Sequence, residues 1–233
     1  METGDLRRRG RIGRSRALIV GSNRGIGLEL TRRVAARGDE VLAACREASP
    51  ELTSLGVEVI EGVDVREDAG VARLVAALGE RELDVAVVVA GILARVDLEA
   101  LDFDRVREQF EVNALGPLRV AAGLRPRLKR GSKLALITSR MGSLADNTSG
   151  GHYGYRMSKA ALNMAGRSLS VDLRADDVTV LLLHPGFVRT EMTGHRGLID
   201  VGESAAGLLA RIDALGLDET GSFWHQSGER LEF

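Results

Sequence analysis

Cysteine is almost absent from this sequence. The 233 residues include a single one, Cys45, so the chain has no pair for an internal disulfide. No other residues stand with Cys45 at metal-ligand spacing. A chain without disulfides is typical of a reducing compartment, so we expect a cytoplasmic protein with no metal site.

A large excess of charge and a long apolar run are also missing. Lysine and arginine number 32 against 33 aspartates and glutamates, which gives a formal net charge of -1. Such a balance offers no general attraction to nucleic acid or to an anionic membrane. No apolar stretch has the length of a membrane span. We therefore expect neither nucleic acid nor a membrane as a partner.

One short segment departs from this balance. Residues 1–15 are rich in arginine, and no apolar run of signal-peptide length follows them. We interpret residues 1–15 as a basic, disordered tail, with a nucleic-acid-binding arm as the alternative. The chain is 44% hydrophobic and 28% charged, which suits one globular domain, at residues 16–233.

Beyond the tail, short apolar runs alternate with segments of helical periodicity. The runs predict strands at 17–20, 41–44, 57–60, 83–90, 133–138 and 178–183. The periodic segments predict helices at 26–37, 69–78, 102–128, 155–174 and 201–215, with a kink or break at Gly116-Pro117. This order specifies an α/β protein: a doubly wound parallel sheet with helices on both faces, in three layers. Ligands of such sheets bind outside the carboxyl ends of the strands.

The turn after the first strand is rich in glycine. Gly21, Gly25 and Gly27 form a G-x-x-x-G-x-G spacing between a predicted strand and a predicted helix. Glycines at these positions allow a tight turn that presents backbone N–H groups and a helix N-terminus to a ligand phosphate. A glycine turn without a ligand is the alternative, but the strand and helix on either side favour a dinucleotide site.

A tyrosine and a lysine stand four positions apart at the start of the predicted helix 155–174. On a helix, the spacing of Tyr155 and Lys159 places both side chains on one face. A nearby ammonium lowers the pKa of a phenol, so the pair has the chemistry of a general acid and base. The same spacing is common on solvated helix faces, and the neighbouring motifs have to decide between the two interpretations.

Taken together, these motifs resemble the short-chain dehydrogenase/reductase family over nearly the whole chain after residue 15. The most specific ones occur in the family's order: Gly21-x-x-x-Gly25-x-Gly27, Asp64, Ala90-Gly91, Asn113, Ser139, Tyr155-x-x-x-Lys159 and Pro185-Gly186. The segments 137–143, 145–151 and 153–159 look like the C-factor-like and sniffer-like carbonyl reductase branch. The resemblance implies a Rossmann fold. The sequence departs from the family's pattern at Val88-Val89, where the family commonly has two asparagines.

The resemblance implies roles for four catalytic residues. Tyr155 would exchange a proton with the substrate oxygen while hydride moves to or from a nicotinamide. Lys159 would lower the pKa of Tyr155 and hydrogen-bond the nicotinamide ribose. Ser139 would hold the substrate carbonyl, and Asn113 would hold a water that relays protons to Lys159.

Two other residues compete for these roles. Tyr153 is six positions from Lys159, which points the two side chains apart on a helix, so we expect Tyr153 to line the pocket. Ser143 is closer than Ser139 to the family's usual interval before the tyrosine. Ser139 nevertheless occupies the strand-end position, and the C-factor-like branch resembles this chain in its longer loop, so Ser139 is the predicted catalytic serine.

The resemblance also implies a set of cofactor contacts. These are Gly21, Ser22, Asn23, Arg24, Gly25, Ile26, Gly27, Arg46, Asp64, Val65, Ala90, Gly91, Tyr155, Lys159, Pro185, Gly186, Val188 and Thr190. Cys45 stands where an acidic residue would bind the ribose of NAD, and Arg46 follows it. Arg24 offers a second guanidinium, which matches a phosphate in geometry and charge. We therefore predict NADP(H) rather than NAD(H).

The predicted function is an NADP(H)-dependent oxidoreductase acting on a small carbonyl or alcohol. The alternative is a cofactor-binding signalling or sensor protein that uses the fold without turnover. The complete set of Asn113, Ser139, Tyr155 and Lys159 favours the enzyme, because a sensor needs no proton relay. Family resemblance further implies a homodimer or homotetramer.

Overall fold

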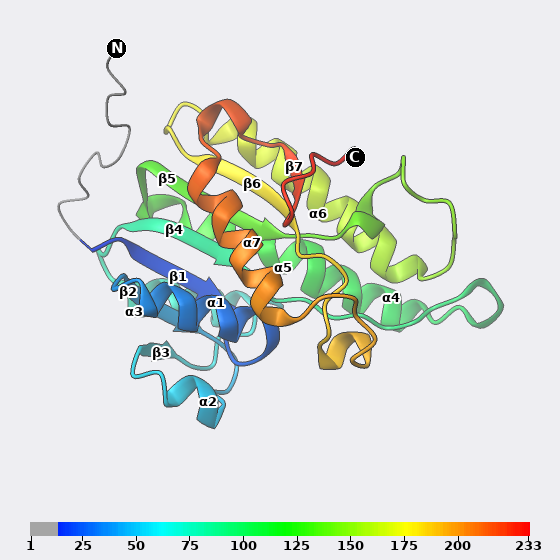
Figure 1. Cartoon of the computed structure of the whole chain (residues 1–233), viewed down its shortest axis with the longest axis horizontal. Coiled ribbons are helices and arrows are strands. Elements are labelled where there is room, and N and C mark those ends of the chain that lie inside the picture. The colour runs from blue at the N-terminus through cyan, green and yellow to red at the C-terminus, as the bar shows by residue number, and fades with distance from the viewer. Residues whose placement is uncertain (1–13) are drawn as a thin grey trace, which may run out of the picture.

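A parallel sheet of seven strands forms the centre of the computed structural model, which describes residues 14–233 (Figure 1). The strands are β1 Arg16–Val20, β2 Glu40–Ala44, β3 Glu58–Ile60, β4 Leu83–Val88, β5 Leu128–Ile137, β6 Thr179–His184 and β7 Phe223–His225. Their order is β3-β2-β1-β4-β5-β6-β7, and every neighbouring pair is parallel. The predicted doubly wound parallel sheet is confirmed.

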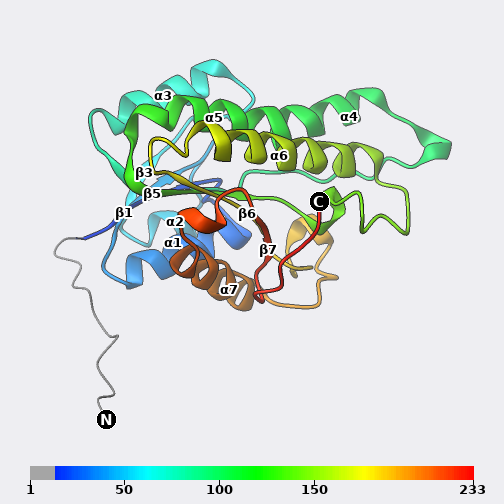
Figure 2. The ribbon, with the colours of Figure 1, turned by 90° about the horizontal axis from the view of Figure 1, so that it is seen from above.

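Helices cover both faces of this sheet and make the outer two layers (Figure 2). They are α1 Gly25–Ala36, α2 Pro50–Thr53, α3 Asp68–Leu78, α4 Phe103–Phe110, α5 Gly116–Leu124, α6 Tyr153–Asp172 and α7 Val201–Ala214. The helices α3, α5 and α6 pack on one face, and α1 and α7 pack on the other. The three-layer α/β/α arrangement places the carboxyl ends of the strands at a single edge.

The central strands are apolar on both faces because helices cover both faces. Along β1, Leu18 and Val20 join the core beneath α3, α5 and α6, while Ala17 and Ile19 join the core beneath α1 and α7. Because side chains alternate along a strand, each strand contributes residues to two separate hydrophobic cores, one on each face of the sheet. Among the described residues, no helix is long and apolar enough to cross a membrane.

Several boundaries differ from the prediction, and the short elements α2 and β7 were not predicted. The tail was expected to extend to residue 15, but Ser15 is buried and its backbone N–H donates to Asp39 Oδ1 at 3.3 Å. Residues 1–13 of that tail lie outside the described part of the chain. Strand β5 begins at Leu128, before the predicted residue 133. Only three residues of β7 pair with β6, too few for an alternating pattern.

The predicted helix 102–128 is interrupted, as expected, but not by a kink at proline alone. A π-helical turn, Glu111–Leu115, separates α4 from α5, and Pro117 occupies the first turn of α5. Leu115, directly before α5, is itself helical with φ -68 and ψ -39, so Pro117 lies within a continuous helical run and removes one N–H donor from it. The π turn carries Asn113, consistent with the frequent occurrence of such turns at functional sites.

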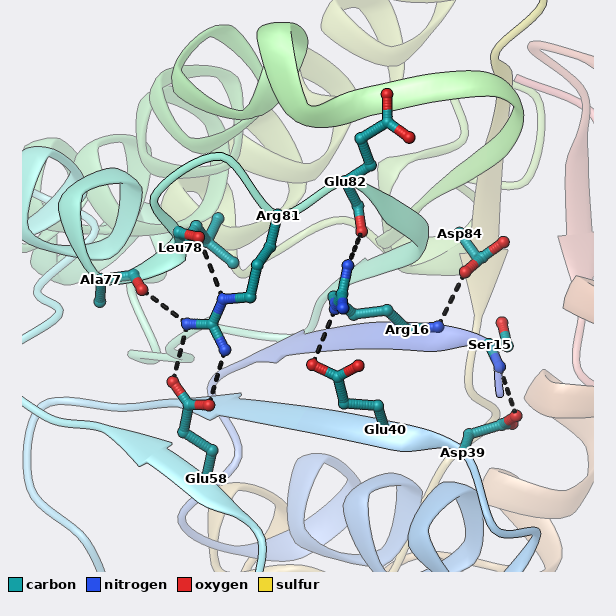
Figure 3. A network of polar contacts seen from close by, with 10 residues as sticks. All are labelled: Ser15, Arg16, Asp39, Glu40, Glu58, Ala77, Leu78, Arg81, Glu82 and Asp84. Atoms are coloured by element: carbon teal, nitrogen blue, oxygen red, sulfur yellow. Dashed lines mark hydrogen bonds and ion pairs between the residues drawn. The ribbon is translucent and has the colours of Figure 1, made fainter. Parts of the chain in front are cut away.

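A network of ion pairs and hydrogen bonds joins the amino ends of the first four strands (Figure 3). Arg16 donates from Nε to Glu40 at 2.8 Å and from its backbone N–H to Asp84 at 2.8 Å. Arg81 binds both carboxylate oxygens of Glu58, at 2.7 and 2.8 Å. These contacts connect neighbouring strands at the edge opposite the predicted ligand site.

Candidate active site

A cavity of about 630 Å³ opens at the carboxyl ends of the strands, where the sheet topology places a ligand. Most of the predicted cofactor residues line it: Gly21, Asn23, Arg24, Gly25, Ile26, Gly27, Arg46, Asp64, Val65, Ala90, Gly91, Tyr155, Lys159, Pro185 and Thr190. The topology thus brings together residues that are distant in sequence. Its lining includes Arg46 after β2, Tyr155 on α6 and Thr190 after β6.

The glycines of the first turn are required by close contacts. Gly21 has φ +92, and a Cβ there would lie 2.7 Å from the backbone nitrogen of Ala90. A Cβ on Gly27 would lie 2.0 Å from the carbonyl oxygen of Gly21. Any larger residue at position 27 would push α1 away from β1, so the glycine holds the helix N-terminus against the strand end.

The N-terminus of α1 has the features of an anion site. Within residues 14–233, no side chain caps this helix, and its first turn holds no acidic residue. The N–H groups at the start of a helix carry partial positive charge and need acceptors from outside the helix. Gly25, Ile26 and Gly27 form this first turn and line the cavity. A pyrophosphate fits these donors, so the residues present suit a dinucleotide.

Three predicted cofactor residues lie behind the cavity wall. Ser22 is fully buried and donates from Oγ to the carbonyl of Ala44 at 3.1 Å, so it fastens the glycine turn to β2. Val188 is buried in the segment after β6, and Gly186 has φ +86. These three residues shape the backbone around the site, but none of them lines the cavity.

Tyr155 and Lys159 both reach the cavity from the first turns of α6. The ammonium of Lys159 donates to the carbonyl of Ile137 at 2.9 Å and lies 5.9 Å from the centroid of the Tyr155 ring. Only 4% of Lys159 is exposed, and burial lowers the pKa of this lysine to about 8.

The pKa of Tyr155 differs from the expectation. Burial raises the pKa of the phenol, and a hydrogen bond with Ser139 opposes that rise. We predicted that Lys159 lowers the pKa of Tyr155. Within the described chain it does not, and its ammonium is held instead at the Ile137 carbonyl at the end of β5. A phenol with a raised pKa is fully protonated at neutral pH, which is the form needed to donate a proton.

The two candidate serines have different surroundings. Ser139 follows β5, accepts a hydrogen bond from the backbone N–H of Met141 at 3.2 Å, and hydrogen-bonds Tyr155. Ser143 accepts from the backbone N–H of Asp146 at 3.2 Å, so its hydroxyl stabilises the following loop. The contact with Tyr155 supports the choice of Ser139.

Asn113 anchors the segment after β4. Its Oδ1 accepts from the backbone N–H of Ile92 at 2.8 Å, while Nδ2 donates to the carbonyl of Ile92 at 2.9 Å. Nδ2 also donates to Ser158 Oγ at 3.0 Å, which ties the π turn to α6. A Cβ at Gly91 would lie 3.3 Å from Asn113 Oδ1 and 3.6 Å from Lys159 Nζ, so both groups border that glycine.

The charged residues that line the cavity differ in how they are paired. Asp64 is bound through both oxygens by Arg66, which lowers the pKa of the carboxyl. Arg24 forms an ion pair with Glu191. The exposed Arg46 forms no ion pair by distance within residues 14–233, although its charge also helps to lower the pKa of Asp64. Its guanidinium can therefore bind an anionic ligand.

Several lining residues were not predicted. They include Cys45, Val63, Arg66 and Thr138 near the strand ends, Glu108 on α4, and Arg189, Glu191, Met192 and His195 in the segment after β6. The second group follows Pro185-Gly186 closely, so proximity to that motif was the available signal. His184, at the end of β6, is not part of the cavity lining, and burial lowers its pKa to about 3, so the ring is neutral.

Comparisons with known proteins agree with this geometry. A family model described as short chain dehydrogenase matches residues 15–198. The chain is 43% identical to 1-hydroxy-2-glutathionyl-2-methyl-3-butene dehydrogenase of Rhodococcus sp. (strain AD45), covering 94% of this chain and 100% of the relative. It is also 47% identical to C-signal of Myxococcus xanthus over 133 residues, covering 56% of this chain and 80% of that protein.

Two solved carbonyl reductases share the whole fold. Sniffer of D. melanogaster has a TM-score of 0.88 and 28% identity, covering 95% of this chain and 100% of that one. A carbonyl reductase from Pseudomonas aeruginosa PAO1, in complex with NADP, has a TM-score of 0.85 and 35% identity, with the same coverage. From its sequence, its fold and its site, this chain belongs to the short-chain dehydrogenase/reductase family of oxidoreductases.

Proposed function

We propose that this protein is an NADP(H)-dependent oxidoreductase that interconverts a carbonyl compound and the corresponding alcohol, with Tyr155 as general acid and base. The observation that carries the proposal is that Tyr155 and Lys159 line a cavity that suits a dinucleotide, while Ser139, outside that lining, hydrogen-bonds Tyr155. Family membership supports oxidoreductase chemistry in general.

The proton chemistry follows from the environments of these side chains. In reduction, the phenol of Tyr155 donates its proton to the carbonyl oxygen as that oxygen gains negative charge. Ser139, which hydrogen-bonds Tyr155, donates to the same oxygen and stabilises its charge. To stabilise the phenolate that remains, the ammonium of Lys159 has to leave the Ile137 carbonyl and approach the Tyr155 oxygen. A bound nicotinamide supplies the hydride, and oxidation runs through the same groups in reverse.

A panel of aldehydes, ketones and quinones tests the activity through NADPH absorbance. The wild-type protein should oxidise NADPH with some of these substrates, and Tyr155→Phe should abolish turnover while NADPH still binds. Unchanged activity in the variant would refute Tyr155 as the acid.

The NADP(H) preference is the second part of the proposal. Arg24 and Arg46 both line the cavity, and Cys45, also in its lining, provides no carboxylate to repel a phosphate. The NADP complex of the Pseudomonas aeruginosa carbonyl reductase supports the choice. Guanidinium groups suit a phosphate better than a neutral ribose hydroxyl.

The substrate class is the third part. The segment after β6 carries Arg189, His195 and Arg196, and Arg189 and His195 line the cavity. Within the described residues, Arg189 and Arg196 donate only to backbone carbonyls and pair with no carboxylate. This rim suits an anionic substrate tail, and the Rhodococcus relative is named for a glutathionyl alcohol. We therefore include thioether conjugates of glutathione among the substrates.

Two matched aldehydes test this class. S-(3-oxopropyl)glutathione and 3-(methylthio)propanal share the reacting group and the sulfur, and differ in the charged tripeptide. We expect at least about tenfold higher kcat/KM for the glutathione adduct, or about 1.4 kcal/mol, and a loss of that preference in Arg189→Ala. Equal kcat/KM values would exclude recognition of the tripeptide.

A signalling or sensor protein without turnover is the second candidate. The similarity to C-signal favours it, although that match covers 56% of this chain. The two candidates differ in one measurement: tight NADPH binding with no turnover of any substrate in the panel, and no effect of Tyr155→Phe, would favour the sensor.

We also propose a homodimer or homotetramer. Met157, Met164 and Val171 repeat at intervals of seven along α6 and are exposed by 49%, 68% and 68%. Apolar side chains aligned on one helix face suit burial against another subunit. Sedimentation or light scattering should show an oligomer in the wild type, and Met164→Glu should shift it towards monomer.

A further inference from the structure

The ion pair between Arg24 and Glu191 connects two walls of the cavity that are far apart in sequence. Arg24 lies in the glycine turn, directly before α1, and Glu191 begins the short turn Glu191–Thr193 after β6. Both side chains line the cavity, and they are 65% and 66% exposed. The pair therefore joins the two walls at the solvent-facing side of the site.

Little else holds these two walls together at this point. A Cβ at Gly25 would lie 3.7 Å from Thr190 Cγ2, which is an ordinary van der Waals distance. The other hydrogen bonds of the segment from Thr190 to Arg196 are local: Thr193 Oγ1, for example, donates to the carbonyls of Val188 and Thr190. The ion pair is thus the main polar link from this segment to the glycine turn among the described residues.

The ion pair is also easily exchanged. Glu191 contacts Arg24 through one guanidinium nitrogen, so the rest of the fork has no partner within the described chain. A solvent-exposed ion pair contributes little, whereas a phosphate binds a guanidinium through two strong charge-assisted hydrogen bonds. A dianionic phosphate beside Arg24 would therefore compete successfully with the Glu191 carboxylate.

We propose that Glu191 is an internal competitor for the cofactor phosphate and a latch for the segment 190–196. Without cofactor, Glu191 neutralises Arg24 and ties this segment to the glycine turn. The 2′-phosphate of NADP(H) takes the guanidinium, and the released segment, which carries Met192 and His195 at the cavity wall, is free to adjust to substrate. The inference rests on the proposed NADP(H) preference, and it assigns Glu191 as a residue that limits that preference.

Fluorescence titration of NADPH and NADH tests the competition without turnover. Glu191→Gln should tighten NADPH binding about two- to fivefold, the range for losing one exposed ion pair, and should leave the NADH dissociation constant unchanged. In an Arg24→Ala background, Glu191→Gln should have no effect. Glu80→Gln is the matched control, because Glu80 pairs with Arg127 at 3.0 Å outside the cavity.

Limited trypsin digestion of the cofactor-free protein tests the latch. Arg196 is exposed in the segment 190–196, so Glu191→Gln should speed cleavage there several-fold, while Glu80→Gln should match the wild type. Unchanged or weaker NADPH binding in Glu191→Gln, an equal change for NADH, or unchanged cleavage would overturn the proposal. If Arg24→Ala weakens NADPH selectively while Glu191→Gln does nothing, the latch fails and the NADP(H) preference stands.

Discussion

The two edges of the sheet use charged residues in opposite ways. At the amino edge, Arg16 and Arg81 are matched by Glu40, Asp84 and Glu58 across neighbouring strands (Figure 3). At the carboxyl edge, the helix N-terminus at Gly25 lacks a cap, and Lys159 is buried as a cation within reach of a carbonyl alone in the described chain. One edge satisfies its charges internally, while the other leaves donors for a ligand.

This difference teaches that the functional edge carries a stability cost. Burying a charged group without an opposite charge is unfavourable, and the lowered pKa of Lys159 expresses that cost. Backbone strain and charged or polar groups without a partner are common at the active sites of enzymes, where they lower stability. Substitutions at the carboxyl edge should therefore mainly lower activity, and substitutions at the amino edge should mainly lower stability.

The largest expected effect is on catalysis at the carboxyl edge. Ser139→Ala should lower kcat by about 10²- to 10³-fold, the range for removing one donor to a developing oxyanion. Ser143→Ala is the control, because its hydroxyl accepts from Asp146 in a loop. Steady-state kinetics with both variants would contradict the assignment if Ser143→Ala were the more damaging change.

The next effect concerns the NADP(H) preference. Arg24→Ala combined with Arg46→Ala should raise the NADPH dissociation constant by about 10- to 100-fold, because hydrogen bonds to charged groups contribute about 1.5–3 kcal/mol. NADH binding should change far less, since its ribose carries no phosphate. Arg73→Ala, outside the cavity lining, serves as control. Equal losses for both cofactors would refute the assignment.

A third prediction would sharpen the comparison by separating stability from activity. The folded-state pKa of Lys159 is lowered to about 8, below its value in the unfolded chain. The unfolded state then binds more protons, so the contribution of Lys159 to stability rises as pH increases from about 8 to about 10.4. Below pH 8 the buried cation is destabilising.

Lys159→Met should therefore raise the free energy of unfolding at pH 7 by roughly 1–3 kcal/mol while abolishing activity. The gain should shrink towards pH 10. Denaturant unfolding of both proteins at pH 7 and pH 10 measures this difference. A variant that is less stable than wild type at pH 7 would show that the lysine is not a net cost.

The smallest effect is expected at the amino edge. Arg81→Ala should lower the free energy of unfolding by about 0.5–1 kcal/mol and leave kcat unchanged, since both members of the pair with Glu58 are partly exposed. Glu58→Gln in the same background should add little. A loss of activity in Arg81→Ala with stability intact would break the division between the edges.

Much of the fold was predictable because local pattern and tertiary environment agree. The run Ala17–Val20 is apolar at every position, and the sheet buries it on both faces. Strand β7 was missed because its register depends on pairing with β6 and not on its own pattern. The early start of β5 was missed for a related reason: Leu128 pairs with Leu83, and the mostly polar residues 129–132 form an irregularity before pairing resumes at Lys133.

Within the site, positions were more predictable than environments. The motif spacing brought Tyr155, Lys159 and the glycine turn to the same cavity. The raised pKa of Tyr155 was not predictable, because it depends on burial and on where the Lys159 ammonium is held. The Arg24–Glu191 pair spans 167 positions in sequence, and no local pattern reports such a contact.

The π turn at Glu111–Leu115 has a consequence for how this chain tolerates insertions and deletions. A π turn holds one residue more than the regular α-helix around it. Deleting one residue there would let α4 and α5 join as a continuous helix, but it would turn the preceding side chains by about 100° about the axis. Asn113 would then swing away from Ile92 and Ser158, while Val120 could still pack in the core. The extra residue thus offsets the two parts of the helix from each other. Asn113 can face the active site, and Val120 can still pack in the hydrophobic core.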